Sequence, residues 1–135
     1  MERKWISLVS VLVLALIISI PSLAWAWSGK VVGVADGDTI TVLHDRKQEK
    51  IRLWGIDCPK KGQDFGTRAK QFTSNLVFSK LVDVSPVTTD RYGRTVAFVR
   101  VRDTLVNEEL IRQGLAWVFI RYCDRAIYER WNSKL

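Results

Sequence analysis

Two short stretches carry the residues whose types and spacing could do chemistry. The first, VADGDTIT at 34–41, places two aspartates around one glycine, and the second of them is Asp38. The other stretch, IRLWGIDCP at 51–59, places Arg52 five residues before Asp57. Hard cations such as Ca²⁺ prefer carboxylate and carbonyl oxygens, and arginine matches phosphate oxygens in a bidentate fashion. The two stretches together therefore predict a site that holds one divalent cation beside one phosphate group.

A second arginine strengthens the phosphate part of this prediction. Arg94 follows a predicted tight turn. Two arginines and a metal ion around one phosphoryl group would stabilise the charge that develops on its oxygens when water attacks. Taken singly, each feature has a plainer interpretation, because Asp-Gly is a common turn dipeptide and a lone arginine usually forms a surface ion pair. The prediction therefore depends on the joint occurrence of the aspartates with both arginines.

Short strands and a few helices must position these residues. The apolar stripe formed by Phe65, Ala69, Phe72 and Leu76 predicts one amphipathic helix, at 67–81. Several short strands with this helix inserted after the third predict a small β-barrel of the OB type with helices packed on it, in the α+β class. We expect strands at 31–34, 39–43, 50–54, 82–87 and 95–101, and further helices at 107–113 and from 125 to the end.

The sequence also predicts the surroundings of several individual segments and residues. Residues 27–30 are expected to be a lead-in to the first strand, and the polar residues at 44–50 a hairpin connection between the second and third strands, in which His44 is expected to be solvated. Pro86 cannot donate a ladder hydrogen bond, so its strand is expected at a sheet edge. Trp117 is assigned to the apolar core.

The N-terminus has the three parts of an export signal. Basic residues precede an almost wholly aliphatic run at 6–20, and a small-residue A-W-A sequence ends at Ala26. We expect cleavage after Ala26, so that a signal peptide at 1–26 precedes one domain at 27–135. The alternative is an uncleaved membrane anchor through 5–29, which has no charged residue and is long enough to span a bilayer. In either case we expect export, with a secreted or periplasmic protein after cleavage.

The charge of the chain indicates a class of partner. The formal net charge of +7 over 135 residues favours a polyanion, either nucleic acid or an acidic membrane surface. A basic surface that only keeps the protein soluble is the alternative interpretation.

Two cysteines, Cys58 and Cys123, complete the inventory. In an exported protein an even number of cysteines favours a disulfide, here Cys58–Cys123. The alternative is a pair of free thiols packed as small apolar groups.

Four motifs in succession now point to a known family. The chain carries D-G-D-T, then I-R-L-W-G-I-D-C-P, then D-R-Y-G-R, and finally V-N-E-E-L-I-R-Q-G-L-A. In this order and spacing, from Gly33 to about Cys123, the chain resembles the thermonuclease (staphylococcal nuclease) family. The resemblance implies a five-stranded OB barrel with three helices and Ca²⁺-dependent hydrolysis of phosphodiester bonds in DNA and RNA. It also implies a preference for single strands, and we expect a monomer without an obligate protein partner.

The resemblance implies a role for each matching residue. Asp38 and Asp57 match the calcium-binding carboxylates, and Cys58 matches the residue whose main-chain carbonyl also binds the metal. Arg52 and Arg94 match the two catalytic arginines. The positions that line the nucleotide site are matched by Arg91, Tyr92 and Tyr122.

Two departures from the family pattern bear on activity. The family has D-x-P-E, with a glutamate that positions or deprotonates the attacking water, whereas this chain has Lys60 at that position. Lysine is a base only as the neutral amine, and nearby carboxylates favour the ammonium. Loss of a positioned base typically lowers a rate by about 100- to 10,000-fold. The C-terminal helix from Arg125 is also expected to be shorter than in the family. We therefore expect a weakened nuclease, with a non-catalytic nucleic-acid-binding OB module as the alternative.

Overall fold

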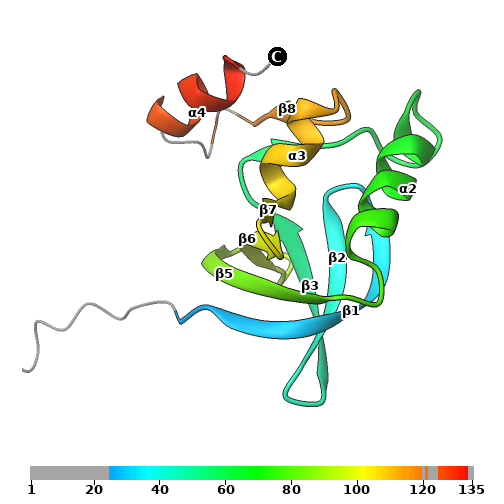
Figure 1. Ribbon diagram of the computed structural model, residues 1–135, viewed down its shortest axis with the longest axis vertical. Coiled ribbons are helices and arrows are strands. Elements are labelled where there is room, and N and C mark those ends of the chain that lie inside the picture. Colours follow the sequence, from blue (N-terminus) through cyan, green and yellow to red (C-terminus); the bar gives the residue numbers. More distant parts are fainter. Residues whose placement is uncertain (1–24, 120, 122–124, 134–135) are drawn as a thin grey trace, which may run out of the picture.

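The core of the fold is a five-stranded barrel. The computed structural model describes residues 25–119, 121 and 125–133. Along the barrel wall the strands follow the order β3, β2, β1, β5, β6, and a parallel pairing of β3 with β6, with Ile51 opposite Thr95, closes the barrel. This mixed barrel confirms the predicted OB fold in the α+β class (Figure 1). The wall strands are β1 (Trp27–Asp36), β2 (Thr39–His44), β3 (Lys47–Leu53), β5 (Leu81–Thr89) and β6 (Thr95–Val101).

Three helices and three very short strands complete the described part of the chain. α2 (Gly66–Val77) packs against β1 and α3 (Val106–Arg112), and α3 in turn packs against β6. β4 (Ile56–Asp57) pairs with β8 (Trp117–Val118), while β7 (Thr104–Leu105) extends the sheet beyond β6. The short C-terminal helix α4 (Arg125–Asn132) contacts β8, so that α3, β8 and α4 gather at one end of the barrel (Figure 1). None of the helices in the described residues is long and apolar enough to cross a membrane.

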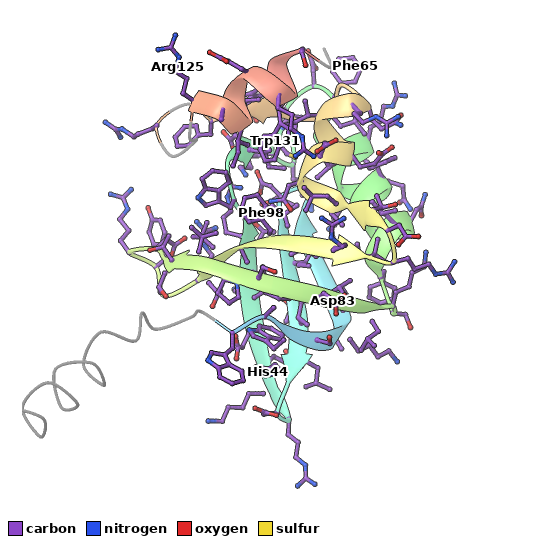
Figure 2. All side chains as sticks on the ribbon, turned by 60° about the vertical axis from the view of Figure 1, so that its left-hand side comes forward. His44, Phe65, Asp83, Phe98, Arg125 and Trp131 are labelled. Atoms are coloured by element: carbon purple, nitrogen blue, oxygen red, sulfur yellow. The ribbon has the colours of Figure 1, made fainter. Side chains whose placement is uncertain are left out.

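The connection between β2 and β3 is much shorter than the predicted 44–50. It consists of Asp45 and Arg46, whose φ angles of 48° and 64° are both positive. Positive φ at both central residues defines a type I′ turn, the hairpin turn whose twist matches that of the strands. His44 is the last residue of β2 and stacks on Trp27 with ring centroids 3.9 Å apart, so it is half-buried and does not lie in a solvated loop. Figure 2 shows His44 at the end of the barrel far from α4.

Two expectations about β1 and β5 are wrong in an informative way. Residues 27–30 are not a lead-in, because they form the first part of β1 and pair with β5 from Trp27 opposite Val84 to Lys30 opposite Leu81. β5 therefore lies between β1 and β6 and is not an edge strand. Pro86 is tolerated because it lies beyond the β1 pairing, next to a bulge in the pairing with β6.

The end of α2 also differs from the prediction. α2 was expected to continue to residue 81, but it ends at Val77, followed by an extended Phe78 and by Ser79 with a φ of 64°. This left-handed residue reverses the chain into β5. The apolar stripe itself stops at Leu76, one residue before the observed end of the helix, so the pattern gave no support for an extension to residue 81.

An aromatic cluster attaches α4 to the barrel. Trp131 in α4 is 1% exposed and packs edge-on against Trp54 and Phe98, with centroid distances of 6.3 Å and 6.5 Å. Phe98 and Trp131 lie close together between the sheet and α4 (Figure 2). The Trp131 indole N–H donates to Glu108 Oε2 in α3 at 3.3 Å, so the polar edge of the ring is also satisfied.

One buried polar side chain connects α3 with the barrel. Asn107 is fully buried, accepts a hydrogen bond from the Val99 N–H at 3.0 Å, and donates to the carbonyls of Trp54 and Ala97 at 3.0 Å and 3.2 Å. A buried amide is stable only when its donors and acceptor are all matched, as they are here. The side chain therefore fixes the position of α3 on the barrel.

Asn107→Ala should destabilise the fold strongly, by about 2–4 kcal/mol, because the Val99 N–H and the Trp54 carbonyl lose their partner inside the protein. Urea denaturation followed by circular dichroism measures the loss. Asn75→Ala, at an exposed position of α2, is the matched control and should change stability by less than about 0.5 kcal/mol. Equal effects of the two substitutions would contradict the structural role of Asn107.

Candidate active site

The turn between β1 and β2 directs Asp38 into the protein. A Cβ added to Gly37 would lie 2.9 Å from the Ala69 Cβ and 3.0 Å from the Cys58 Sγ, so a larger residue would push the turn away from α2. Thr73 in α2 donates to the Gly37 carbonyl at 2.6 Å and holds the turn there. The Asp-Gly pair is therefore part of a packed contact that sets the direction of the Asp38 side chain.

The Asp38 carboxylate is fully buried and makes five polar contacts. Its Oδ1 accepts from Thr39 Oγ1 at 3.0 Å and from Lys60 Nζ at 3.0 Å. Its Oδ2 accepts from the Cys58 N–H and from Lys60 Nζ, both at 2.8 Å, and lies 3.3 Å from Arg52 Nη2. Since an ionised carboxylate offers about four lone-pair positions, the acceptor capacity of Asp38 is filled by the protein itself.

The Arg52 side chain connects the end of β3 with β4 through hydrogen bonds. Its Nη1 donates to the carbonyls of Leu53 and Ile56, each at 2.8 Å, and its Nη2 lies 3.0 Å from Asp57 Oδ1. With the Asp38 contact, both terminal nitrogens are engaged, and the side chain is 16% exposed. These contacts explain how a partly buried arginine near the end of a strand is accommodated, and among the described residues they leave only its Nε–H without a hydrogen-bond partner.

Lys60 completes the cluster from the loop before α2. Its ammonium contacts both Asp38 oxygens and lies 3.5 Å from Asp57 Oδ1, with 45% of the side chain exposed. The loop backbone is fixed as well, because the Lys60 N–H donates to Gln63 Oε1 at 2.7 Å and the Gln63 N–H returns to the Lys60 carbonyl at 2.9 Å. A Cβ at Gly66 would collide with that carbonyl, so the loop folds tightly onto the start of α2.

The environment of the cluster shifts the pKa values of Asp38 and Asp57 in opposite directions. Burial opposes the ionisation of Asp38, but the Arg52 charge, the Lys60 hydrogen bond and the Cys58 N–H outweigh it and hold the Asp38 pKa below its usual value. Burial, followed by the neighbouring Asp38, raises the pKa of Asp57 despite the opposing charges of Lys60 and Arg52. Asp38 is therefore the more acidic member of the pair.

Arg94 belongs to a second group of residues at the β5–β6 turn. Its Nε lies 2.7 Å from Asp90 Oδ2, and Asp90 Oδ1 accepts hydrogen bonds from the backbone N–H groups of Tyr92 and Arg94. Burial opposes the ionisation of Asp90, but the hydrogen bonds from Arg94 and Tyr92 outweigh it and lower the Asp90 pKa. The guanidinium groups of Arg91 and Arg94 lie 4.9 Å and 5.3 Å from the Tyr92 ring centroid, and Tyr92 is 69% exposed. An exposed ring flanked by two cations suits contact with a nucleotide.

The structure thus divides the predicted site residues into two groups. Asp38, Arg52, Asp57 and Lys60 converge through direct contacts, whereas Arg94 makes its contacts with Asp90 and Tyr92 and none with that cluster within the described residues. The barrel brings the groups to neighbouring strands, since β6 starts one residue after Arg94 and pairs with β3.

The remaining predicted residues concern the cysteines and one tyrosine. Cys58 is a buried free thiol in the described part of the chain, and burial, with Asp38 nearby, raises its pKa to about 12. Cys123 and Tyr122 lie outside the described residues. The Cys58–Cys123 disulfide, the metal role of the Cys58 carbonyl and the nucleotide contact of Tyr122 therefore stay predictions.

Trp117 is a candidate site residue that the sequence interpretation assigned to the core. It is 50% exposed and lies in β8 directly opposite Asp57 in β4. Directly opposed residues of an antiparallel pair share one face of the sheet with their Cβ atoms about 5 Å apart. The indole therefore borders the side of the sheet on which Asp57 meets Arg52 and Lys60. The sequence carries no signal for this exposure, because residues 116–120 are uniformly apolar and show no alternation.

The fold and the cluster define a class of protein, an OB barrel with an Asp–Arg–Asp cluster at the end of its first three strands. Comparison with known proteins specifies the family. Residues 50–133 match the family model described as staphylococcal nuclease homologue, and the chain belongs to this family.

Individual relatives agree with this assignment. The chain is 39% identical over 127 residues to a micrococcal nuclease of Shigella flexneri, covering 84% of this chain and 72% of the relative. It is 42% identical over 121 residues to an uncharacterized endonuclease of Escherichia coli, covering 89% and 76%. A thermonuclease of Staphylococcus hyicus is 38% identical over 95 residues, covering 64% and 56%.

Proposed function

We propose that this chain is a nuclease that hydrolyses phosphodiester bonds in DNA and RNA, with single strands preferred. The observation that carries the proposal is the cluster of the buried Asp38 with the partly buried Arg52 and Asp57, in an OB barrel of a family whose members include proteins named nucleases. We also propose that hydrolysis is slow, because Lys60 stands where the resemblance implies a base and an ammonium that bridges two carboxylates cannot accept a proton.

The substrate class agrees with the charge of the chain. The net charge of +7 attracts a polyanion. The proposed contacts for the nucleic acid are the exposed Tyr92, its cationic neighbours Arg91 and Arg94, and the exposed Trp117. Aromatic faces accept any base, which favours unpaired strands over duplex. Arg94 matches a catalytic arginine of the family, and we assign it to the phosphate, which it would reach by releasing Asp90.

The cofactor implied by the resemblance is Ca²⁺, and the donor set must be tested against it. Asp38, Asp57 and the Cys58 carbonyl are oxygen donors of the right chemical kind. However, the Lys60 ammonium contacts both carboxylates, and the residues that the structure describes include no group of three histidine, cysteine, aspartate or glutamate side chains able to hold a metal. The donor set as arranged here does not fit Ca²⁺, and no step of the reaction is assigned to a metal ion.

A second candidate function is nucleic-acid binding without turnover. It is favoured by the contacts of Lys60, which leave the cluster without a base and with its carboxylates already paired. The exposed aromatic and basic residues would serve binding equally well in either function, so the two candidates differ only in the fate of the bound strand.

For the location of the protein we propose export through the N-terminal segment at 1–26, with release as a secreted or periplasmic monomer. An uncleaved anchor through 5–29 is the competing proposal. Both follow from the charge and hydropathy pattern of the sequence.

Lys60→Glu should raise the rate of DNA cleavage by about 100- to 10,000-fold, because it restores a carboxylate able to position water. The assay measures cleavage of heat-denatured DNA both in CaCl₂ and in a chelator, and a reaction without enzyme serves as the blank. Lys61→Glu makes the same charge change at the neighbouring exposed residue and should have little effect. If the folded wild type and Lys60→Glu are both inactive, the nuclease proposal is wrong and binding without turnover is favoured.

Trp117→Ala should weaken binding to a single-stranded oligonucleotide by about tenfold, since one base–aromatic stack contributes about 1–3 kcal/mol. Fluorescence anisotropy at several salt concentrations measures the affinity, which should fall as salt rises. Phe78→Ala removes an exposed aromatic ring at the end of α2 and should leave the affinity unchanged. An unchanged affinity for Trp117→Ala would exclude stacking on this residue.

Intact-mass analysis of the exported protein should give a chain that begins at Trp27. The reason is the A-W-A sequence that ends at Ala26. A chain that starts at Met1 and is recovered with membranes would instead support the anchor through 5–29.

A further inference from the structure

We infer that the ammonium of Lys60 takes the place of the divalent cation in this chain, so that the carboxylate pair is neutralised from within the protein and does not bind Ca²⁺. The inference rests on the proposed function in one respect, because Ca²⁺ is the ion that the family resemblance implies for this site. It concerns this chain's own residues and follows from three observations at the cluster.

The first observation is the geometry of Lys60. Its Nζ lies 3.0 Å and 2.8 Å from the two Asp38 oxygens and 3.5 Å from Asp57 Oδ1. A cation that bridges two carboxylates must approach those same oxygens. Lys60 and a metal ion therefore compete for one position, and the lysine is covalently attached to the site.

The second observation is the local charge. Two carboxylates, Asp38 and Asp57, face two cations, Arg52 and Lys60, so the cluster is formally neutral. A site for a divalent cation needs an excess of negative charge, because the ion gives up hydration energy that only strong oxygen ligands replace. Adding Ca²⁺ here would place two further positive charges beside an ammonium and a guanidinium, with no carboxylate left to balance them.

The third observation is that the lysine is held in place. The Lys60 backbone exchanges hydrogen bonds with Gln63, and Gly66 packs directly on the Lys60 carbonyl. A lysine on a loose loop could swing away to admit a metal ion. Here the backbone is fixed, and movement of the side chain alone would take two hydrogen bonds from a fully buried carboxylate.

The arrangement has a functional consequence for phosphate binding. The Lys60 side chain is 45% exposed, so its ammonium presents positive charge at the surface of the cluster. Nucleic acid can therefore meet a fixed cation without a dissolved one. Binding to a single-stranded oligonucleotide should therefore not require Ca²⁺, and at matched ionic strength it should be no stronger in CaCl₂ than in a chelator.

The test is a CaCl₂ titration of the wild-type protein and three variants, followed by isothermal calorimetry and by thermal unfolding. Lys60→Gln removes the ammonium, Lys60→Glu replaces it with a carboxylate, and Lys61→Gln removes an adjacent exposed charge as the matched control. We expect wild type and Lys61→Gln to show no saturable heat and no shift in Tm up to millimolar CaCl₂. Lys60→Gln should have a lower Tm that Ca²⁺ restores, and Lys60→Glu should bind Ca²⁺ at least tenfold more tightly than Lys60→Gln.

Two results would overturn the inference. One is saturable Ca²⁺ binding by the wild type with a rise in Tm, a measurement that needs no variant to fold. The other is the absence of Ca²⁺ binding in both Lys60 variants when circular dichroism shows that they are folded. Because neither measurement uses nucleic acid, a failure here is distinct from a failure of the nuclease proposal, which is decided by cleavage alone.

Discussion

The ionised carboxylate of Asp38, buried without contact with solvent, is the constraint on which the site depends. A buried charge is tolerated only with full pairing, and the partners of Asp38 come from β2, β3 and the loop that precedes α2. These partners are themselves held in place, since Arg52 donates to the Leu53 and Ile56 carbonyls and the Lys60 backbone donates to Gln63. The first three strands and the start of α2 are thereby tied to one oxygen pair.

Much of this could be predicted from the sequence because the signals are local. The acidic turn, the arginine five residues before Asp57, and the helix with its apolar stripe all depend on neighbours in the chain. The closed five-stranded barrel also followed, because short strands with turn residues between them have few ways to protect their edges. The family resemblance gave the same fold by an independent route.

The features of the fold and the site that were not predicted depend on contacts between residues that are distant in the sequence. Lys60 was identified as a replacement for a base, but its position across from Asp38, 22 residues away, became visible only in the folded chain. The hairpin between β2 and β3 was predicted, but its two-residue length was not, because two non-glycine residues, Asp45 and Arg46, adopt the left-handed conformation that the register of the strands requires. Trp117 was assigned to the core by its apolarity, whereas the pairing of β8 with β4 leaves it exposed.

The first residues of β1 have a consequence for the timing of maturation. Trp27 is already paired with β5, a strand that begins 54 positions later in the sequence at Leu81. Cleavage after Ala26, as proposed, would leave no spacer between the new amino terminus and the barrel. A peptidase needs an extended substrate, so processing would have to precede the docking of β1 on β5. Barrel completion and removal of the leader would then be ordered events, with the last wall contact formed only after the chain is released.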